Sequence, residues 1–273
     1  MQNNNLFEKL DIVLQGQYDV FTSEIIENYF QLPFVNNIIL SCWEDDDISS
    51  LESIKQKYSN RIIVLTNKKP NNFGDDNVNL QIVGSYNGII KSDTEYSIKM
   101  RTDQLYDYNS MLVMYNFFIE NRKEHLIFVP GMYPHLLFHP RDHVFWGKRV
   151  DLIKLFDIPL KVNNVIDRVR ISKQDLWKYY GYFIRTETYI GANYCSNFDE
   201  RIKIFLIQPE KYLFDGSSNW YESLEVGNNI TKKLFKSFPK TNINLRWPKK
   251  NLSAYPYEDQ KYGYNECWHE DGV

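Results

Sequence analysis

Short runs of Ile, Val and Leu alternate with helical segments along the first half of the chain, and this alternation restricts the fold more than any other feature. The aliphatic runs cover residues 11–16, 37–42 and 61–66, and a further strand is expected at 96–101. Segments with helix caps or helical periodicity lie between these strands at 22–31, 49–58 and 78–91. Buried strands separated by helices are typical of a mainly parallel sheet with both faces covered. The first half therefore predicts an α/β fold.

The second half of the chain is less regular. We expect helices at 107–121, 151–156 and 175–184, strands at 126–129 and 202–207, and an irregular Pro-rich stretch at 130–140. The tail after Phe238 is rich in Asn, Pro and Tyr and has no clear periodicity. Because no stretch is typical of a linker, we predict a single domain over residues 1–273 that ends in an irregular C-terminal extension.

The charge balance and the cysteines restrict the partners and the compartment. The chain has 32 Lys and Arg residues against 35 Asp and Glu residues, a net charge of −3, which argues against general electrostatic binding of nucleic acid. Cys42, Cys195 and Cys267 are odd in number and far apart, as expected in a reducing compartment. The N-terminus lacks a signal-peptide pattern, and the longest apolar stretch, 111–119, is too short to span a membrane. We expect a soluble cytoplasmic protein that could still rest on a membrane surface.

Several catalytic motifs are missing from the sequence. There is no Gly-x-Gly-x-x-Gly after the first strand, no Walker A loop, no His-Glu-x-x-His and no Gly-x-Ser-x-Gly. These absences disfavour nicotinamide enzymes, P-loop NTPases, zincins and α/β-hydrolases. No redox cofactor is expected.

Charged residues alternate along the strand expected at 96–101. Lys99, Arg101 and Asp103 are two residues apart, so their side chains point to one side and converge at the carboxyl end of the strand. Ligands of parallel sheets bind at this end. Two cations suit a diphosphate, and a carboxylate suits a divalent cation or a sugar hydroxyl. An edge strand that turns a charged face to water would show the same pattern.

Segments in four regions carry a resemblance to a known family. They are Ile12-Val13-Leu14-Gln15-Gly16; Ile38-Ile39-Leu40-Ser41-Cys42-Trp43-Glu44; Asn79, Gln81, Ser85 and Gly88 followed by Lys99-Met100-Arg101-Thr102-Asp103; and His139-Pro140-Arg141-Asp142-His143-Val144-Phe145-Trp146-Gly147. With these segments in this order over about residues 11–156, the chain resembles the WavE family of lipopolysaccharide-synthesis proteins. The stretch up to Asp103 is also similar to the segment that contains the Asp-x-Asp motif of GT-A glycosyltransferases.

The resemblance implies a GT-A-like fold and a glycosyltransferase that moves a sugar from a nucleotide-sugar donor to a bacterial surface glycan, either lipopolysaccharide or capsule. It implies a nucleotide-sugar-binding part at about 1–125 and an acceptor part at about 126–273. The acceptor would be a glycan or lipid-linked glycan at the cytoplasmic face of the inner membrane. The residues expected to contact the donor are Gln15, Gly16, Glu44, Asp45, Asn79, Gln81, Lys99, Arg101 and Asp103.

One departure from the GT-A pattern concerns the metal ion. Arg101 stands where the motif has its first aspartate, and a lone Asp103 is a poor site for Mn²⁺ or Mg²⁺. Lys99 and Arg101 could neutralise the diphosphate instead. His269, in the tail, could supply another metal ligand, as C-terminal histidines do in some GT-A enzymes; a frayed polar terminus is the alternative. The sequence leaves the need for a divalent cation open.

Residues 139–147 hold the first candidate for a catalytic base. This segment combines two histidines and an aspartate with aromatic residues, which is unlike a solvated loop. An inverting transferase needs a carboxylate that takes the proton of the acceptor hydroxyl. Asp142 is the first candidate and Asp151 the second, although Asp151 could simply cap the helix that follows. We interpret His139 as a packed structural histidine.

Two other functions are compatible with the sequence. Because the first aspartate of the motif is missing, the chain could be a nucleotide-sugar-fold protein that binds or scaffolds without chemistry. It could also transfer another phosphate-linked group onto glycans. Binding without turnover would identify the first function, and the mass of the product would identify the second.

Overall fold

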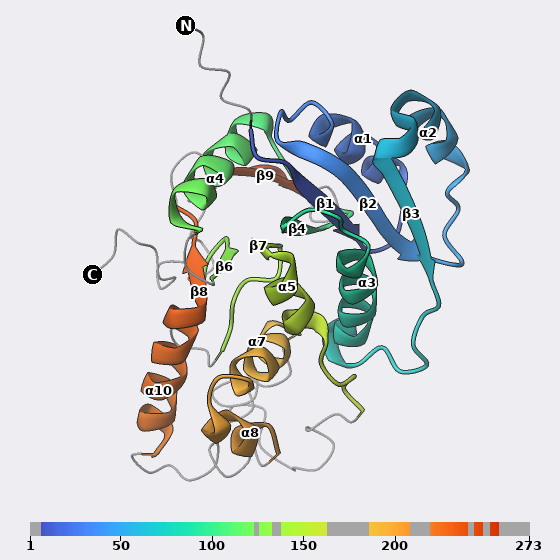
Figure 1. Ribbon diagram of the computed structural model, residues 1–273. Coiled ribbons are helices and arrows are strands. Elements are labelled where there is room, and N and C mark those ends of the chain that lie inside the picture. The colour runs from blue at the N-terminus through green and yellow to red at the C-terminus, as the bar shows by residue number, and fades with distance from the viewer. Residues whose placement is uncertain are drawn as a thin grey trace, which may run out of the picture.

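A seven-stranded sheet forms the centre of the protein, with the strand order β3-β2-β1-β4-β7-β6-β8 (Figure 1). The computed structural model describes residues 7–122, 126–132, 138–162, 186–207, 219–239, 243–247 and 252–256. Helices cover the sheet, and a smaller three-stranded sheet lies beside it.

Parallel strands form one half of the large sheet. They are β1 (Leu10–Gln15), β2 (Val35–Trp43), β3 (Ile62–Asn67) and β4 (Tyr96–Arg101). Every residue of β1 is buried, as the unbroken aliphatic run predicts for a central parallel strand. The chain continues from β1 to β2 and β3 on one side and then returns to place β4 on the other side, so the strand order reverses between β1 and β4.

The other half of the sheet is mixed. β7 (Val144–Lys148) runs antiparallel to β4, and β6 (Ile127–Val129) runs antiparallel to β7. β8 (Phe235–Ser237) then pairs parallel with β6. Because most strand pairs are parallel, the predicted α/β fold, a mainly parallel sheet flanked by helices, is confirmed.

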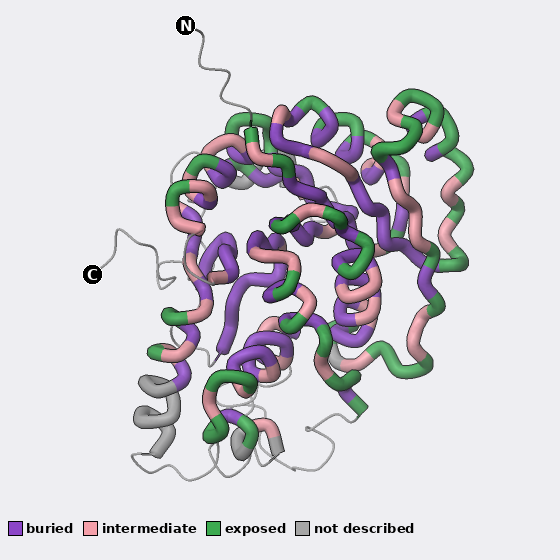
Figure 2. Tube along the Cα trace, viewed as in Figure 1, coloured by how far each residue is buried: buried purple, intermediate pink, exposed green. Residues whose placement is uncertain are grey.

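Alternate residues of the strands face two separate cores. Ile12 and Leu14 of β1 pack with residues of α1 (Val20–Tyr29) and α4 (Tyr108–Asn121). Val13, between them, packs on the opposite face with residues of α3 (Val78–Ile90), α5 (Arg149–Phe156) and α7 (Thr186–Ser196). Figure 2 shows the buried strands running between the two helical layers. The arrangement follows from the two-residue period of a strand.

The remaining helices lie at the edges of these layers. They are η1 (Ser49–Leu51), α2 (Glu52–Tyr58), η2 (Ser59–Arg61), η3 (Asp75–Asn77), α8 (Glu200–Ile207) and α10 (Asn219–Leu234). Among the described residues, no helix has both the length and the apolar character that crossing a bilayer requires.

The small second sheet brings the C-terminal part of the chain to the end of β4. β5 (Leu105–Tyr106) follows β4 closely and pairs antiparallel with β9 (Asn244–Trp247). β9 in turn pairs antiparallel with β10 (Leu252–Pro256). These short strands lie in a tail that shows no periodicity, and they were not predicted from the sequence.

The strand predicted at 202–207 is wrong, because this segment is the helix α8. Ile202 and Leu206 both pack against the core beside α7, and their four-residue spacing is that of one helix face. A short apolar run fits a buried strand and a buried helix equally well, which explains the error. The helix predicted at 175–184 lies outside the described residues.

Close packing of α3 on β1 gives a test of the fold at Gly88. A Cβ at this position would lie 2.3 Å from Cγ1 of the buried Val13. Replacing a helix-interior glycine with alanine ordinarily stabilises a protein by about 1 kcal/mol. Here the β-branched Val13 cannot move aside, so we expect Gly88→Ala to lower the free energy of unfolding by about 1–3 kcal/mol.

Urea denaturation measures this change in the free energy of unfolding. The control is Gln56→Ala, at an exposed position of α2, which we expect to change stability by less than about 0.5 kcal/mol. Equal or greater stability of Gly88→Ala would contradict the packing described for α3.

Candidate functional site

The candidate site lies where the strand order of the large sheet reverses. The carboxyl ends of β1 and β4 are direct neighbours there, because Gln15 pairs with Arg101 and the Thr102 amide donates to the Gln15 carbonyl. In open α/β sheets, the crevice at such a reversal, outside the carboxyl ends of the strands, is where ligands bind. The charged residues predicted from the alternation along β4 are located at this place.

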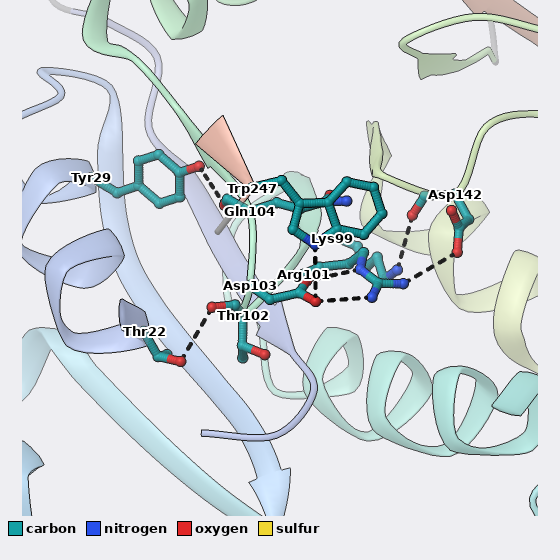
Figure 3. A network of polar contacts seen from close by, with 9 residues as sticks. All are labelled: Thr22, Tyr29, Lys99, Arg101, Thr102, Asp103, Gln104, Asp142 and Trp247. Atoms are coloured by element: carbon teal, nitrogen blue, oxygen red, sulfur yellow. Dashed lines mark hydrogen bonds and ion pairs between the residues drawn. The ribbon is translucent and has the colours of Figure 1, made fainter. Parts of the chain in front are cut away.

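Arg101 and Asp103 form a two-pronged ion pair at the end of β4 (Figure 3). Nε of Arg101 donates to Oδ1 of Asp103 at 2.9 Å, and Nη2 donates to Oδ2 at 3.1 Å. The Asp103 side chain is buried, whereas 33% of the Arg101 side chain is exposed. Burial alone would lower the pKa of Arg101, but the bonds to Asp103 and the charges of Asp142 and Glu187 raise it, so the guanidinium stays charged.

Asp142, which precedes β7, brings a second carboxylate to Arg101. Its Oδ2 lies 3.7 Å from Nη1 of Arg101 (Figure 3). Burial would raise the pKa of Asp142, but the charges of Arg101, His143, Lys99 and His139 outweigh it, and the pKa is held below its usual value. Asp142 is therefore ionised at neutral pH.

Lys99 is fully buried and bonds within the cluster. Its Nζ donates to the main-chain carbonyl of Asp142 at 3.3 Å. The Gln81 amide, with its oxygen turned toward Lys99, accepts from Nζ at 3.0 Å and donates to Oδ2 of Asp142 at 3.0 Å. Burial lowers the pKa of Lys99 to about 7, although the charge of Asp142 acts in the opposite direction. Lys99 and Gln81 thus hold Asp142 in place.

Aromatic and histidine side chains surround the charged cluster. Trp247 of β9 donates from Nε1 to Oδ2 of Asp103 at 3.3 Å, and its ring centroid lies 5.4 Å from the Arg101 guanidinium carbon. The His143 ring stands edge-on to the same indole at 5.3 Å. His139 is buried and shares a hydrogen bond with Thr188, in agreement with a packed structural histidine. Trp247 was missed from the sequence, since it lies in a tail without periodicity.

Gln15, Gly16 and Asn79 have structural contacts beside the cluster. Gln15 is buried against Gly84 of α3. Gly16 has a positive φ of 138°, and a Cβ there would lie 2.6 Å from Oγ1 of Thr102, so the close approach of the two loops requires glycine. The Asn79 amide bonds to main-chain atoms of Asn72 and Lys161, which occupies its polar groups away from the cluster.

Glu44 and Asp45 lie at the same edge of the sheet but toward β3. Both side chains are exposed. The Glu44 amide donates to the Asn67 carbonyl, and the Asp45 carboxylate pairs with Lys69 at 2.6 Å. No contact among the described residues joins either side chain to Arg101. These two residues can reach only a ligand that extends across β1 to the end of β2.

The structure removes Asp151 from the site. β7 is antiparallel to β4, so its start, beside Asp142, lies at the carboxyl end of β4, and its end lies at the amino end. Asp151 follows that far end, in the first turn of α5, within 3.5 Å of Lys154. Its place as the second candidate base is therefore wrong, and a position near a helix start explains it better. His269 lies outside the described residues.

The groups present do not fit a divalent cation. Both carboxylate oxygens of Asp103 are bound by Arg101, and Oδ2 also accepts from Trp247. No group of three or more His, Cys, Asp or Glu side chains that could hold a metal occurs in the described ranges. A guanidinium occupies the position that a cation would need.

Sequence comparison connects this site with a known family. A family model described as WavE lipopolysaccharide synthesis matches residues 26–233. The chain belongs to this WavE family. The match includes Arg101, Asp103 and Asp142. It begins after the Ile12–Gly16 segment and continues past residue 156, where the resemblance seen in the sequence ends. Among curated proteins, none matches the chain significantly.

Solved structures with some likeness to this WavE protein include three nucleotide-related proteins. The first is a 4-diphosphocytidyl-2C-methyl-D-erythritol synthase from Anaerococcus prevotii, with 10% identity, coverage of 65% of this chain and 86% of that chain, and a TM-score of 0.41. The second is HddC from Yersinia pseudotuberculosis complexed with GMP-PN, with 14% identity, coverage of 56% and 81%, and a TM-score of 0.38. The third is a cytidylyltransferase from Leptospira borgpetersenii, with 12% identity, coverage of 77% and 99%, and a TM-score of 0.37. These TM-scores are too low to support a functional conclusion.

The shifted pKa of Lys99 gives a test of the cluster. Because the Asp142 charge raises the pKa of Lys99 against the effect of burial, Asp142→Asn should move that pKa below about 7. NMR titration of the Cε signals of labelled lysines measures it, with Lys99→Met to assign the signal. Asp93→Asn, an exposed residue before β4, should leave it unchanged. A Lys99 that titrates like a solvated lysine would contradict the geometry of the cluster.

Proposed function

We propose that this WavE protein transfers a sugar from a nucleotide-sugar donor to a glycan acceptor in lipopolysaccharide synthesis. The observation that carries the proposal is the convergence of Arg101, Asp103 and Asp142 at the reversal between β1 and β4. This location favours a nucleotide ligand, since nucleotides bind at such reversals in doubly wound sheets. Membership of a lipopolysaccharide-synthesis family supports a glycan as the acceptor.

Arg101 is the group that we assign to the donor diphosphate. A guanidinium binds phosphate oxygens in a two-pronged geometry, and a third of this side chain is exposed. Asp103 fixes its orientation through both carboxylate oxygens. Lys99 is too deeply buried to share this role. We therefore revise its predicted role: Lys99 does not contact the donor but holds Asp142 in position.

Asp142 is the proposed catalytic base. In a direct displacement, the acceptor hydroxyl oxygen forms the new bond to the sugar carbon while the bond from that carbon to the diphosphate oxygen breaks. The hydroxyl proton passes to the Asp142 carboxylate, which is ionised at neutral pH. The negative charge that develops on the leaving diphosphate is stabilised by Arg101, so no step requires a metal ion.

The nucleoside would extend from Arg101 over the ends of β1 and β2. Gln15 and Gly16 lie at the first end, and Glu44 and Asp45 follow the second. An acidic side chain there can accept hydrogen bonds from ribose hydroxyls. We place the acceptor, a glycan or a lipid-linked glycan, on the side of β7. We also propose that the protein acts at the cytoplasmic face of the inner membrane.

A screen followed by turnover measurements tests this function. Thermal shifts with nucleoside diphosphates and nucleotide sugars, with and without Mn²⁺, identify the donor, because a ligand that binds only the native state raises the Tm. We expect binding without Mn²⁺. With that donor, Asp142→Asn should lower kcat by about 10²-fold or more while the nucleoside diphosphate still binds, because Arg101 keeps both of its bonds to Asp103.

Asp93→Asn serves as the matched control, since Asp93 is exposed and precedes β4 at the opposite end of the strand. Full turnover by Asp142→Asn would refute the base assignment. Binding without turnover by the unaltered protein would favour a non-catalytic binding protein, and a product whose mass contains a transferred phosphate would favour transfer of a phosphate-linked group.

A further inference from the structure

Gln104 carries a buried amide that has no partner in the ligand-free protein. The residue is fully buried, and neither its side-chain nitrogen nor its side-chain oxygen makes a hydrogen bond. Its main-chain carbonyl does accept from Tyr29 (Figure 3). Buried polar groups without partners are rare and destabilising, so each requires a physical explanation.

The pairing of β5 with β9 places this amide beside the charged cluster. Leu105 pairs with Arg246 and Tyr106 with Leu245, so the same register continued by one residue sets Gln104 opposite Trp247. Opposed residues of an antiparallel pair have their side chains on the same face. Trp247 contacts both Arg101 and Asp103, and Figure 3 shows Gln104 on the Tyr29 side of the cluster, away from Asp142.

We infer that Gln104 recognises the sugar of the donor and that the Trp247 indole covers it in the ligand-free protein. This inference rests on the proposed function. A glutamine amide offers an acceptor oxygen and a donor nitrogen side by side, which suits adjacent sugar hydroxyls. The indole adds a flat apolar face with a polar edge, which suits the C–H face of a sugar ring.

The position of Trp247 agrees with an order of subsites along the edge of the sheet. The proposed nucleoside contacts lie at the ends of β1 and β2, and the diphosphate contact lies at the end of β4. Trp247 also touches His143, which directly precedes β7. Trp247 therefore reaches the β7 side of Arg101, where the group attached to the diphosphate would project, and Gln104 lies on the side of Tyr29.

Binding and stability of Gln104→Met test the inference. Methionine has nearly the shape of glutamine but no amide, so we expect the Tm of the free protein to rise by about 2–4 °C. Calorimetry with the nucleotide sugar found in the screen should show a Kd at least about tenfold weaker. The Kd of the matching nucleoside diphosphate should stay within about twofold. Gln56→Met, at an exposed position of α2, is the matched control.

The outcomes separate this inference from the proposed function. If the unaltered protein binds no nucleoside diphosphate or nucleotide sugar, the proposed function fails, and the inference fails with it. If it binds both but Gln104→Met binds the nucleotide sugar equally well, or loses both ligands equally, only the inference fails. A lower Tm would also overturn it, because the amide would then be hydrogen-bonded in the free protein.

Tryptophan fluorescence gives a second readout. Displacement of the Trp247 indole by the sugar predicts a larger change of emission with the nucleotide sugar than with the nucleoside diphosphate. Trp247→Phe should remove most of that change. An equal change for both ligands, or a signal unaffected by Trp247→Phe, would refute the covering role of Trp247.

Discussion

The buried charges at the carboxyl end of β4 are the constraint on which the candidate site depends. A charge taken out of water is costly unless other groups compensate for it. Arg101 is compensated by two carboxylates, Asp103 and Asp142, and Lys99 by the Gln81 oxygen and a main-chain carbonyl. Each of these groups is therefore held in one geometry by the others, and such preorganisation is what recognition of a charged ligand requires.

The fold supplies these partners from distant parts of the chain. β4 carries Lys99 and Arg101, α3 carries Gln81, the segment before β7 carries Asp142, and β9 carries Trp247. Antiparallel pairing of β4 with β7 brings Asp142 to the end of β4, and Gln81 of α3 bonds there to both Lys99 and Asp142. The short β5–β9 pairing then closes the cluster with a residue more than 100 positions away in the sequence.

The sequence was sufficient to predict the regular half of the fold but only part of the site. Unbroken aliphatic runs identified β1 to β3, and the two-residue alternation along β4 identified Lys99, Arg101 and Asp103, because both signals are local. The use of each side chain depends on neighbours that no local pattern specifies. Asp103 is occupied by Arg101 rather than available to a metal, and Asp151 lies at the wrong end of β7 because that strand is antiparallel. The tail around Trp247 has no periodicity, so its approach to the cluster could not be foreseen.

The central claim is that the exposed part of Arg101 receives the phosphates of a nucleotide-linked donor. A crystal structure of the protein with the nucleoside diphosphate that gives the largest thermal shift tests it most directly. The account predicts phosphate oxygens within hydrogen-bonding distance of the Arg101 guanidinium, at the ends of β1 and β4. A nucleotide bound on another surface, with Arg101 still paired only to Asp103 and Asp142, would contradict it.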